Sequence, residues 1–213
     1  AKFPEERDEC IVAITGRKHP ERFSKERAEL YDFYDLKGAL ESLLASRRLA
    51  NYAFAPAKDP RFIDGVCAEL LLDGKKVGTL GQVVPALVAG MRLQTPLFIG
   101  MLDIGALFKA ETKGLHYKQL SQFPSVSRDV AFLAPASLEH AQVLDFIKSC
   151  KLNNLEKVEL FDIFADASLG GKRSMAYSLT FRASDRTLTD DEVNAAHEQL
   201  RAKLASGLGV ELR

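Results

Sequence analysis

The fold is decided by Lys172-Arg173-Ser174-Met175-Ala176-Tyr177-Ser178-Leu179-Thr180-Phe181-Arg182, a stretch in which large and small side chains alternate. Its large residues are Met175, Tyr177, Leu179 and Phe181, and the residues between them are small or polar. Alternation with a period of two is typical of a β-strand with one buried face. The sequence therefore predicts a strand whose large side chains pack on helices and whose other face stays open.

The segments around this strand follow a fixed order. Two more strands are predicted over residues 129–134 and 155–165, separated by a helix that we expect Ser137 to cap. Thr189-Asp190-Asp191-Glu192 is a capping box and starts a second helix, after which residues 209–213 form a short strand. The order strand, helix, strand, strand, helix, strand predicts a ferredoxin-like βαββαβ domain.

The first half of the chain predicts a separate domain built on a sheet. A strand is expected over residues 9–16, and an amphipathic helix over 34–48, where leucines recur at three- and four-residue spacing. Asp73-Gly74 lies between two apolar runs and predicts a two-residue hairpin. Residues 113–122 are polar and aperiodic, so we expect one domain over 1–118 and another over 119–213. The fold class is therefore α+β: a mixed, largely antiparallel domain followed by the ferredoxin-like one.

Several motifs, taken in order, resemble one family. Tyr31-Asp32-Phe33-Tyr34-Asp35-Leu36-Lys37-Gly38 resembles the "DFFDLKG" signature of the phenylalanyl-tRNA synthetase β chain. The segment 73–85 is similar to the family's "dGk.iG.lGelhP", with Gln82 and Val84 where that pattern has Glu and His. Residues 123–213 resemble its ferredoxin-fold anticodon-binding domain. The sequence opens at Ala1 without Met, so we expect a C-terminal fragment of that longer chain.

The resemblance implies both a fold and a function. The first domain would be class II synthetase-like but without catalytic residues, and the second would recognise the anticodon of tRNA(Phe). The parent enzyme would charge tRNA(Phe) with phenylalanine, using ATP and Mg on a separate α subunit within an α2β2 heterotetramer. The fragment itself would hold no cofactor and would be inactive alone, and its sequence contains no phosphate-binding glycine loop.

Charge limits how such a domain could bind RNA. The whole chain carries 29 basic and 29 acidic residues, and residues 121–213 carry 11 basic and 13 acidic ones, a net charge of −2. A stand-alone nucleic-acid binder usually has a basic surplus, because neutralising phosphates supplies much of its affinity. The balance therefore argues against a tight, independent tRNA binder.

The cysteines and the hydropathy pattern favour a cytoplasmic protein. Cys10, Cys67 and Cys150 are far apart, which predicts neither a zinc site nor a disulfide framework, and an odd count suits a reducing compartment. No apolar run approaches the ~18–20 residues that a membrane span needs, and we expect no membrane partner. The four histidines share no short spacing, so structural or surface roles are expected for them.

The open face of the strand at 172–182 is the predicted RNA-binding surface, because ferredoxin-like RNA binders lay single-stranded bases on such a face. Phe161, on the face opposite Leu160 and Asp162, is expected to offer a stacking surface. Five basic residues are expected to contact phosphates: Arg128, Lys172, Arg173, Arg182 and Arg186. A basic stripe formed by these five would favour RNA, whereas scattered charges would favour the alternative, a protein-interaction scaffold that binds no RNA.

Overall fold

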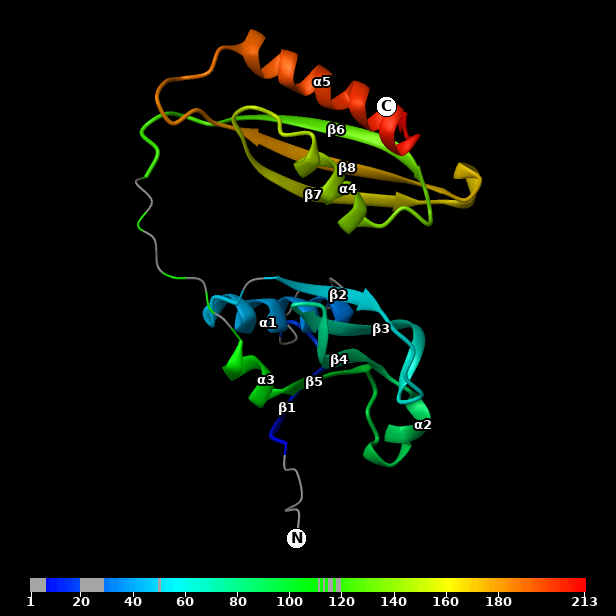
Figure 1. Cartoon of the computed structure of the whole chain (residues 1–213). Coiled ribbons are helices and arrows are strands. Elements are labelled where there is room, and N and C mark those ends of the chain that lie inside the picture. The colour runs from blue at the N-terminus through cyan, green and yellow to red at the C-terminus, as the bar shows by residue number, and fades with distance from the viewer. Residues whose placement is uncertain are drawn as a thin grey trace. The chain divides into compact units, whose positions relative to one another are not determined.

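The computed structural model describes residues 7–19, 29–49, 51–110, 112, 114, 117 and 120–213. The chain divides into two compact units, Ala1–His116 and Tyr117–Arg213. Each unit has its own sheet and its own hydrophobic core (Figure 1).

The first unit is built on a five-stranded sheet. In sheet order its strands are β1 (Glu9–Thr15), β5 (Leu97–Asp103), β4 (Lys75–Val83), β3 (Phe62–Leu72) and β2 (Tyr52–Pro56). Every strand pair that the structure describes here is antiparallel. The predicted hairpin is confirmed, since Asp73 and Gly74 join β3 to β4 with φ angles of 49° and 75°, the left-handed values that a type I′ turn requires.

Helix α1 (Phe33–Ser46) packs against this sheet. Its first turn is fixed by a capping box: the Asp32 carboxylate accepts a hydrogen bond from the Asp35 amide at 3.0 Å, and the Asp35 carboxylate accepts one from the Asp32 amide at 2.8 Å. Three leucines spaced four residues apart form its buried side: Leu36, Leu40 and Leu44. Three short helices complete the unit, α2 (Pro85–Val88), η1 (Ala89–Met91) and α3 (Ile104–Lys109).

Two glycines of β4 permit close packing inside the first unit. A Cβ atom on Gly81 would lie 2.7 Å from the Phe62 ring and 2.8 Å from the Val66 carbonyl oxygen. A Cβ atom on Gly78 would lie 2.7 Å from the carbonyl oxygen of Met101. At these two positions β4 therefore packs against its neighbours more closely than a side chain would allow.

The second unit is a four-stranded antiparallel sheet with two long helices. In sheet order its strands are β7 (Leu155–Ala165), β8 (Lys172–Phe181), β6 (Val126–Pro135) and β9 (Glu211–Leu212). Helix α4 (His140–Ser149) connects β6 to β7, η2 (Ala167–Leu169) lies between β7 and β8, and α5 (Asp190–Leu208) follows β8 (Figure 1). The predicted βαββαβ order is confirmed.

The large side chains of β8 form the centre of the second core, as their alternation predicts. Met175, Tyr177, Leu179 and Phe181 are each at most 1% exposed. They pack with apolar residues of both helices: Val143 and Ile147 of α4 and Val193, Leu200 and Leu204 of α5. Burial raises the pKa of Tyr177 to about 12, and its hydroxyl lies 3.0 Å from Nδ1 of His140. The opposite face of β8 is therefore the one that the helices leave uncovered.

Of the two helix starts predicted for the second unit, one is correct. At α5 the Thr189 amide donates to Oε2 of Glu192 at 3.0 Å and the Glu192 amide donates to Oγ1 of Thr189 at 3.4 Å, which confirms the capping box. The prediction for Ser137 is wrong: α4 starts at His140, and the Glu139 amide donates to Oε1 of Gln142 at 2.8 Å. A turn after β6, in which the Leu138 amide bonds to the Pro135 carbonyl, delays the helix by two residues.

The edge strand β7 contains two β-bulges. Its register shifts between Leu155 and Lys157 and again between Leu160 and Asp162. Glu156 and Phe161 are therefore extra residues with no partner on β8. Each bulge changes which side chains of β7 share a face.

Candidate nucleic-acid interface

The uncovered face of the second sheet is polar and acidic at its centre. On β8 it consists of small residues: Ser178 and Thr180, which are partly exposed, and Ser174 and Ala176, which are only 8% and 9% exposed. Directly paired residues of antiparallel strands share a face. Ser178 pairs with both Asp129 of β6 and Glu159 of β7, and Ala176 pairs with Asp162. These carboxylates disfavour phosphates at the middle of this face.

Two predicted cations lie at opposite ends of the same face. Lys172 forms an ion pair with Glu211 of β9. Nε of Arg182 lies 3.0 Å from Oε2 of Glu156, the first bulged residue of β7. At ~3.3 Å per strand residue the two positions are roughly 33 Å apart. Each cation is therefore matched by a neighbouring carboxylate, and the two do not act as one cluster.

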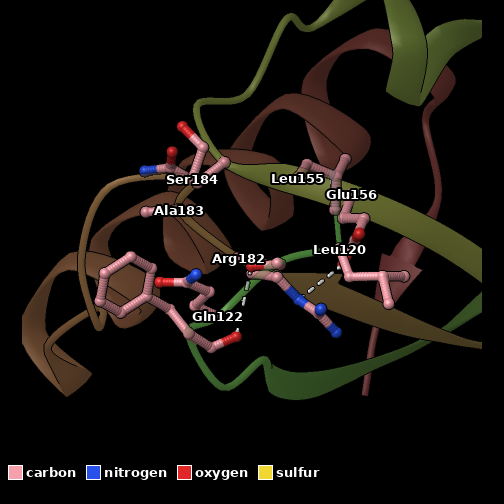
Figure 2. Close-up of a pocket in the computed structure, with 10 residues that line it drawn as sticks. Leu120, Gln122, Leu155, Glu156, Arg182, Ala183 and Ser184 are labelled. Carbon is pink, nitrogen blue, oxygen red and sulfur yellow. Dashed lines mark hydrogen bonds and ion pairs between the residues drawn. The ribbon is translucent and has the colours of Figure 1, made fainter. Parts of the chain in front are cut away.

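Arg182 also lines a pocket of about 470 Å³ within the second unit. Figure 2 shows its side chain reaching toward Glu156 and Leu120. The rest of the lining mixes apolar groups with two amides and two hydroxyls: Phe123, Leu155, Ala183, Gln122, Asn154, Ser121 and Ser184. A pocket of this volume is in the range of small-molecule sites, and its polar groups suit a ligand with hydrogen-bonding edges.

Arg128 lies on the helix side of the sheet, so its predicted place beside the open face is wrong. It pairs with Leu179, one of the core-facing residues of β8. Its guanidinium donates to Oδ1 of Asp190 at 2.8 Å and to Oδ1 of Asn194 at 3.0 Å, both on α5. The sequence could have predicted this position, because residues two apart on a strand share a face and Val130 is buried.

Arg173 and Arg186 also lie away from the open face. Arg173 shares the parity of Met175, and its guanidinium donates to the carbonyl oxygen of Leu138, in the segment before α4. Arg186 precedes α5 and forms two hydrogen bonds with Glu192, at 2.7 and 2.8 Å. Those hydrogen bonds are the main reason that the pKa of Glu192 falls to about 2. The predicted basic stripe of five residues therefore does not form.

Phe161 is exposed, and the bulge changes its surroundings from those predicted. Its side chain is 58% exposed, whereas Leu160 packs against the core. The prediction that Asp162 shares a face with Leu160 is wrong, because the bulge pairs Leu160 with the buried Tyr177 and Asp162 with Ala176 on the open face. The role of Phe161 in RNA binding stays a prediction.

Two residues of the open face are absent from the predicted site. Phe164 pairs with Ser174 and is 53% exposed, so it adds a second aromatic ring beside the small residues of β8. Nη1 of Arg213 lies 3.4 Å from Oγ of Ser174. The sequence alone does not predict the face of Phe164, because simple alternation from Leu160 assigns Phe164 to the core side and the bulge at Phe161 reverses that assignment.

No metal-ion or membrane-spanning feature is found in the part of the chain that the structure describes. No group of three or more His, Cys, Asp and Glu side chains in that part could hold a metal ion. None of its helices combines the length and apolarity needed to cross a bilayer.

Comparison with known proteins places this chain among the components of tRNA synthetases. Residues 121–213 match the ferredoxin-fold anticodon binding domain, and residues 1–104 match the phenylalanyl tRNA synthetase beta chain CLM domain. The two matches lie in the second and first units. The chain belongs to the phenylalanyl-tRNA synthetase β-chain family, of which it contains these two domains.

Two proteins with similar sequences are both phenylalanine–tRNA ligase β subunits. The chain is 33% identical over 216 residues to the phenylalanine–tRNA ligase β subunit of Shouchella clausii, a match that covers 100% of this chain. It is 35% identical over 212 residues to that of Streptococcus mutans, covering 99% of this chain. In both cases the match covers 26% of the relative, so the chain spans about a quarter of the length of these relatives.

Proposed function

We propose that this chain supports the charging of tRNA(Phe) by a phenylalanine–tRNA ligase. The second unit contacts the anticodon region of the tRNA, and the first unit contributes to assembly with a catalytic α subunit, in an α2β2 heterotetramer. The chemistry, with its ATP and Mg, belongs to that α subunit. Three free cysteines suit a cytoplasmic setting.

One observation carries the tRNA-binding part of this proposal. A βαββαβ sheet that matches an anticodon binding domain leaves one face uncovered by its helices, with exposed aromatic side chains on its edge strand. Phe161 and Phe164 are more than half exposed. Aromatic rings beside small residues suit the stacking of unpaired bases, the part of an RNA that ferredoxin-like binders read.

Two observations support a supporting rather than catalytic role for the first unit. Its described ion pairs join near neighbours on its own surface, such as Lys18 with Asp35 at 3.1 Å and Arg61 with Asp59 at 2.7 Å. The two glycines of β4 allow close packing against neighbouring strands. No phosphate-binding loop motif occurs in the sequence. We expect the purified chain to show no phenylalanine-dependent exchange between ATP and pyrophosphate, and exchange that copurifies with the chain would refute this assignment.

A protein-interaction scaffold is the second candidate, and the charge distribution favours it. Arg128, Arg182 and Arg186 are each paired with a carboxylate, and the centre of the open face is acidic. A scaffold would use the same exposed aromatic residues to bind protein instead of bases. The two candidates differ in their affinity for tRNA.

A titration with tRNA at two salt concentrations separates them. The chain is titrated with tRNA(Phe) and with a tRNA(Phe) that carries a different anticodon, and binding is followed by fluorescence anisotropy. We expect weak binding that falls with salt and is stronger for the native anticodon. Equal binding of both tRNAs would remove the anticodon from the proposal, and no binding of either would favour the scaffold.

A further inference from the structure

A groove of about 350 Å³ lies between the end of α4 and the edge strand β7 in the second unit. Three lysines line it, Lys148 from the last turn of α4, Lys151 just after that helix, and Lys157 from β7. One carboxylate also lines it, that of Glu156, which is already paired with Arg182. A fourth lysine approaches the same helix end, where Nζ of Lys203 donates to the carbonyl oxygen of Cys150 at 3.1 Å. We call the part lined by Lys148, Lys151 and Lys157 the lysine groove.

The cations of this groove are less engaged than those of the predicted site. The Lys151 side chain is exposed and makes neither a hydrogen bond nor an ion pair with the residues that the structure describes, whereas its backbone amide donates to the carbonyl oxygen of Lys148 at 3.2 Å. Lys148 lies 3.7 Å from Asp145, and both side chains are about three-quarters exposed. Lys157 pairs with Glu159 at 2.7 Å, again with both side chains more than half exposed. Exposed pairs of this kind contribute little and are readily exchanged for a stronger anion.

The groove combines an apolar floor with a basic rim. The floor is formed by Ile147, which is 1% exposed, Leu152, which is 9% exposed, and the half-buried Leu155 and Val158. These side chains also pack into the domain core. The positive charges stand on exposed side chains at the rim, where a phosphate chain can reach them.

The position of the groove also resolves the conflict between a net charge of −2 and RNA binding. The carboxylates of Asp129, Glu159 and Asp162 occupy or border the open face, where they repel phosphates. Lys148 and Lys151 lie at the end of α4, away from these carboxylates, and let phosphates approach without crossing that region, whereas Lys157, paired with Thr180 and ion-paired with Glu159, borders the open face. Bases and phosphates would then meet different parts of the domain, with β7 between them.

We propose that the lysine groove contacts the phosphate backbone of the bound tRNA, through Lys148, Lys151 and Lys157. This inference rests on the proposed function, because it assigns the electrostatic part of tRNA binding to a surface at the end of α4 and the edge of β7, next to the open face. With three phosphate contacts, the affinity for tRNA should depend only modestly on salt concentration. This agrees with the weak binding expected of a domain with no basic surplus.

The test is the salt dependence of binding in the whole 213-residue chain. The triple variant Lys148→Ala, Lys151→Ala, Lys157→Ala is compared with the control Lys58→Ala, Lys75→Ala, Lys109→Ala, which removes the same charge from exposed positions of the first unit. The dissociation constant for tRNA(Phe) is measured from 50 to 300 mM KCl. We expect the groove variant to lower the slope of log affinity against log salt by about 2 to 3, at roughly 0.7–0.9 per phosphate contact, and the control to keep the slope of the unmodified chain.

Three outcomes overturn the inference, and they are distinguishable. Equal slopes for the two triple variants, with normal binding by the unmodified chain, would overturn the groove and leave the proposed function standing. No tRNA binding by the unmodified chain would remove both. A groove that binds poly-glutamate while its variant binds tRNA normally would identify a site for acidic protein. Thermal unfolding of each variant checks that the second unit stays folded, and the single variant Lys151→Ala, which removes a cation without a partner, repeats the test with the least structural change.

Discussion

Nη2 of Arg128 lies 2.8 Å from Oδ1 of Asp190, and this pair ties the start of β6 to the first turn of α5. The carboxylate sits at a helix N-terminus, where a negative charge is favoured. Three donors of Arg128 are used, on Asp190, Asn194 and the Ser127 carbonyl. The guanidinium therefore holds the second unit together instead of facing a ligand.

Replacing Arg128 is expected to change stability more than tRNA binding. Arg128→Ala should lower the free energy of unfolding of the second unit by about 1 kcal/mol, because three hydrogen bonds are lost. Arg128→Lys should cost a similar amount, since an ammonium group cannot reproduce the fork of donors. Chemical denaturation measures the stability, and tRNA titration should show an unchanged salt slope. If Arg128→Ala reduces that slope while Arg128→Lys restores it, Arg128 is a phosphate contact after all.

Phe161 and Leu160 should respond in opposite ways to truncation. Phe161→Ala should leave the unfolding temperature nearly unchanged, because the ring is 58% exposed, and should weaken tRNA binding by about 1–3 kcal/mol if a base stacks on it. That loss should not vary with salt. Leu160→Ala should instead cost about 2 kcal/mol of stability, since Leu160 packs on the core. A large drop in unfolding temperature for Phe161→Ala would show that the ring is part of the core.

The ion pair of Arg186 and Glu192 predicts an acid-dependent loss of stability. Hydrogen bonds from Arg186, and then from the Thr189 amide, lower the pKa of Glu192 from 4.5 to about 2 in the folded chain. A carboxylate with a lowered folded-state pKa stabilises the fold above its unfolded value, and this contribution disappears as the pH falls from about 4.5 to 2. We expect Glu192→Gln to be less stable than the unmodified chain at pH 6 and equally stable near pH 2. Thermal unfolding across this range provides the measurement, and a stability difference that stays constant down to pH 2 would contradict the lowered pKa.

Gly81 should not tolerate a side chain. Gly81→Ala would place Cβ 2.7 Å from the Phe62 ring and 2.8 Å from a backbone carbonyl, which cannot move without shifting β3. We expect a loss of about 1–3 kcal/mol in the stability of the first unit. Gly38→Ala in α1 is the matched control, because nothing lies within 4 Å of its Cβ position and alanine favours a helix by about 1 kcal/mol. Similar stability changes in the two variants would show that the packing around Gly81 is looser than described.

The alternation of β8 and the Asp73-Gly74 turn predict the fold well, because both signals depend only on residues close in sequence. The start of α4 is mispredicted for the opposite reason: the Leu138–Pro135 hydrogen bond that delays it is one of several turns that the same residues could form. For the site, parity alone places Arg128 and Arg173 with the core-facing residues of their strands. The face of Asp162 and Phe164, by contrast, depends on a bulge that exists only because β7 is paired with β8.

The two bulges of β7 also bear on how the chain behaves in concentrated solution. An edge strand with a regular row of free amide and carbonyl groups can recruit another strand and start fibril growth. β7 is an edge strand that carries three apolar side chains about half exposed, Phe161, Ile163 and Phe164, which favour such pairing. Extra residues at Glu156 and Phe161 break the spacing of its outer edge, so that an incoming strand cannot keep register along its length. The bulge that brings Phe161 to the surface thus also disfavours strand pairing between separate molecules along β7.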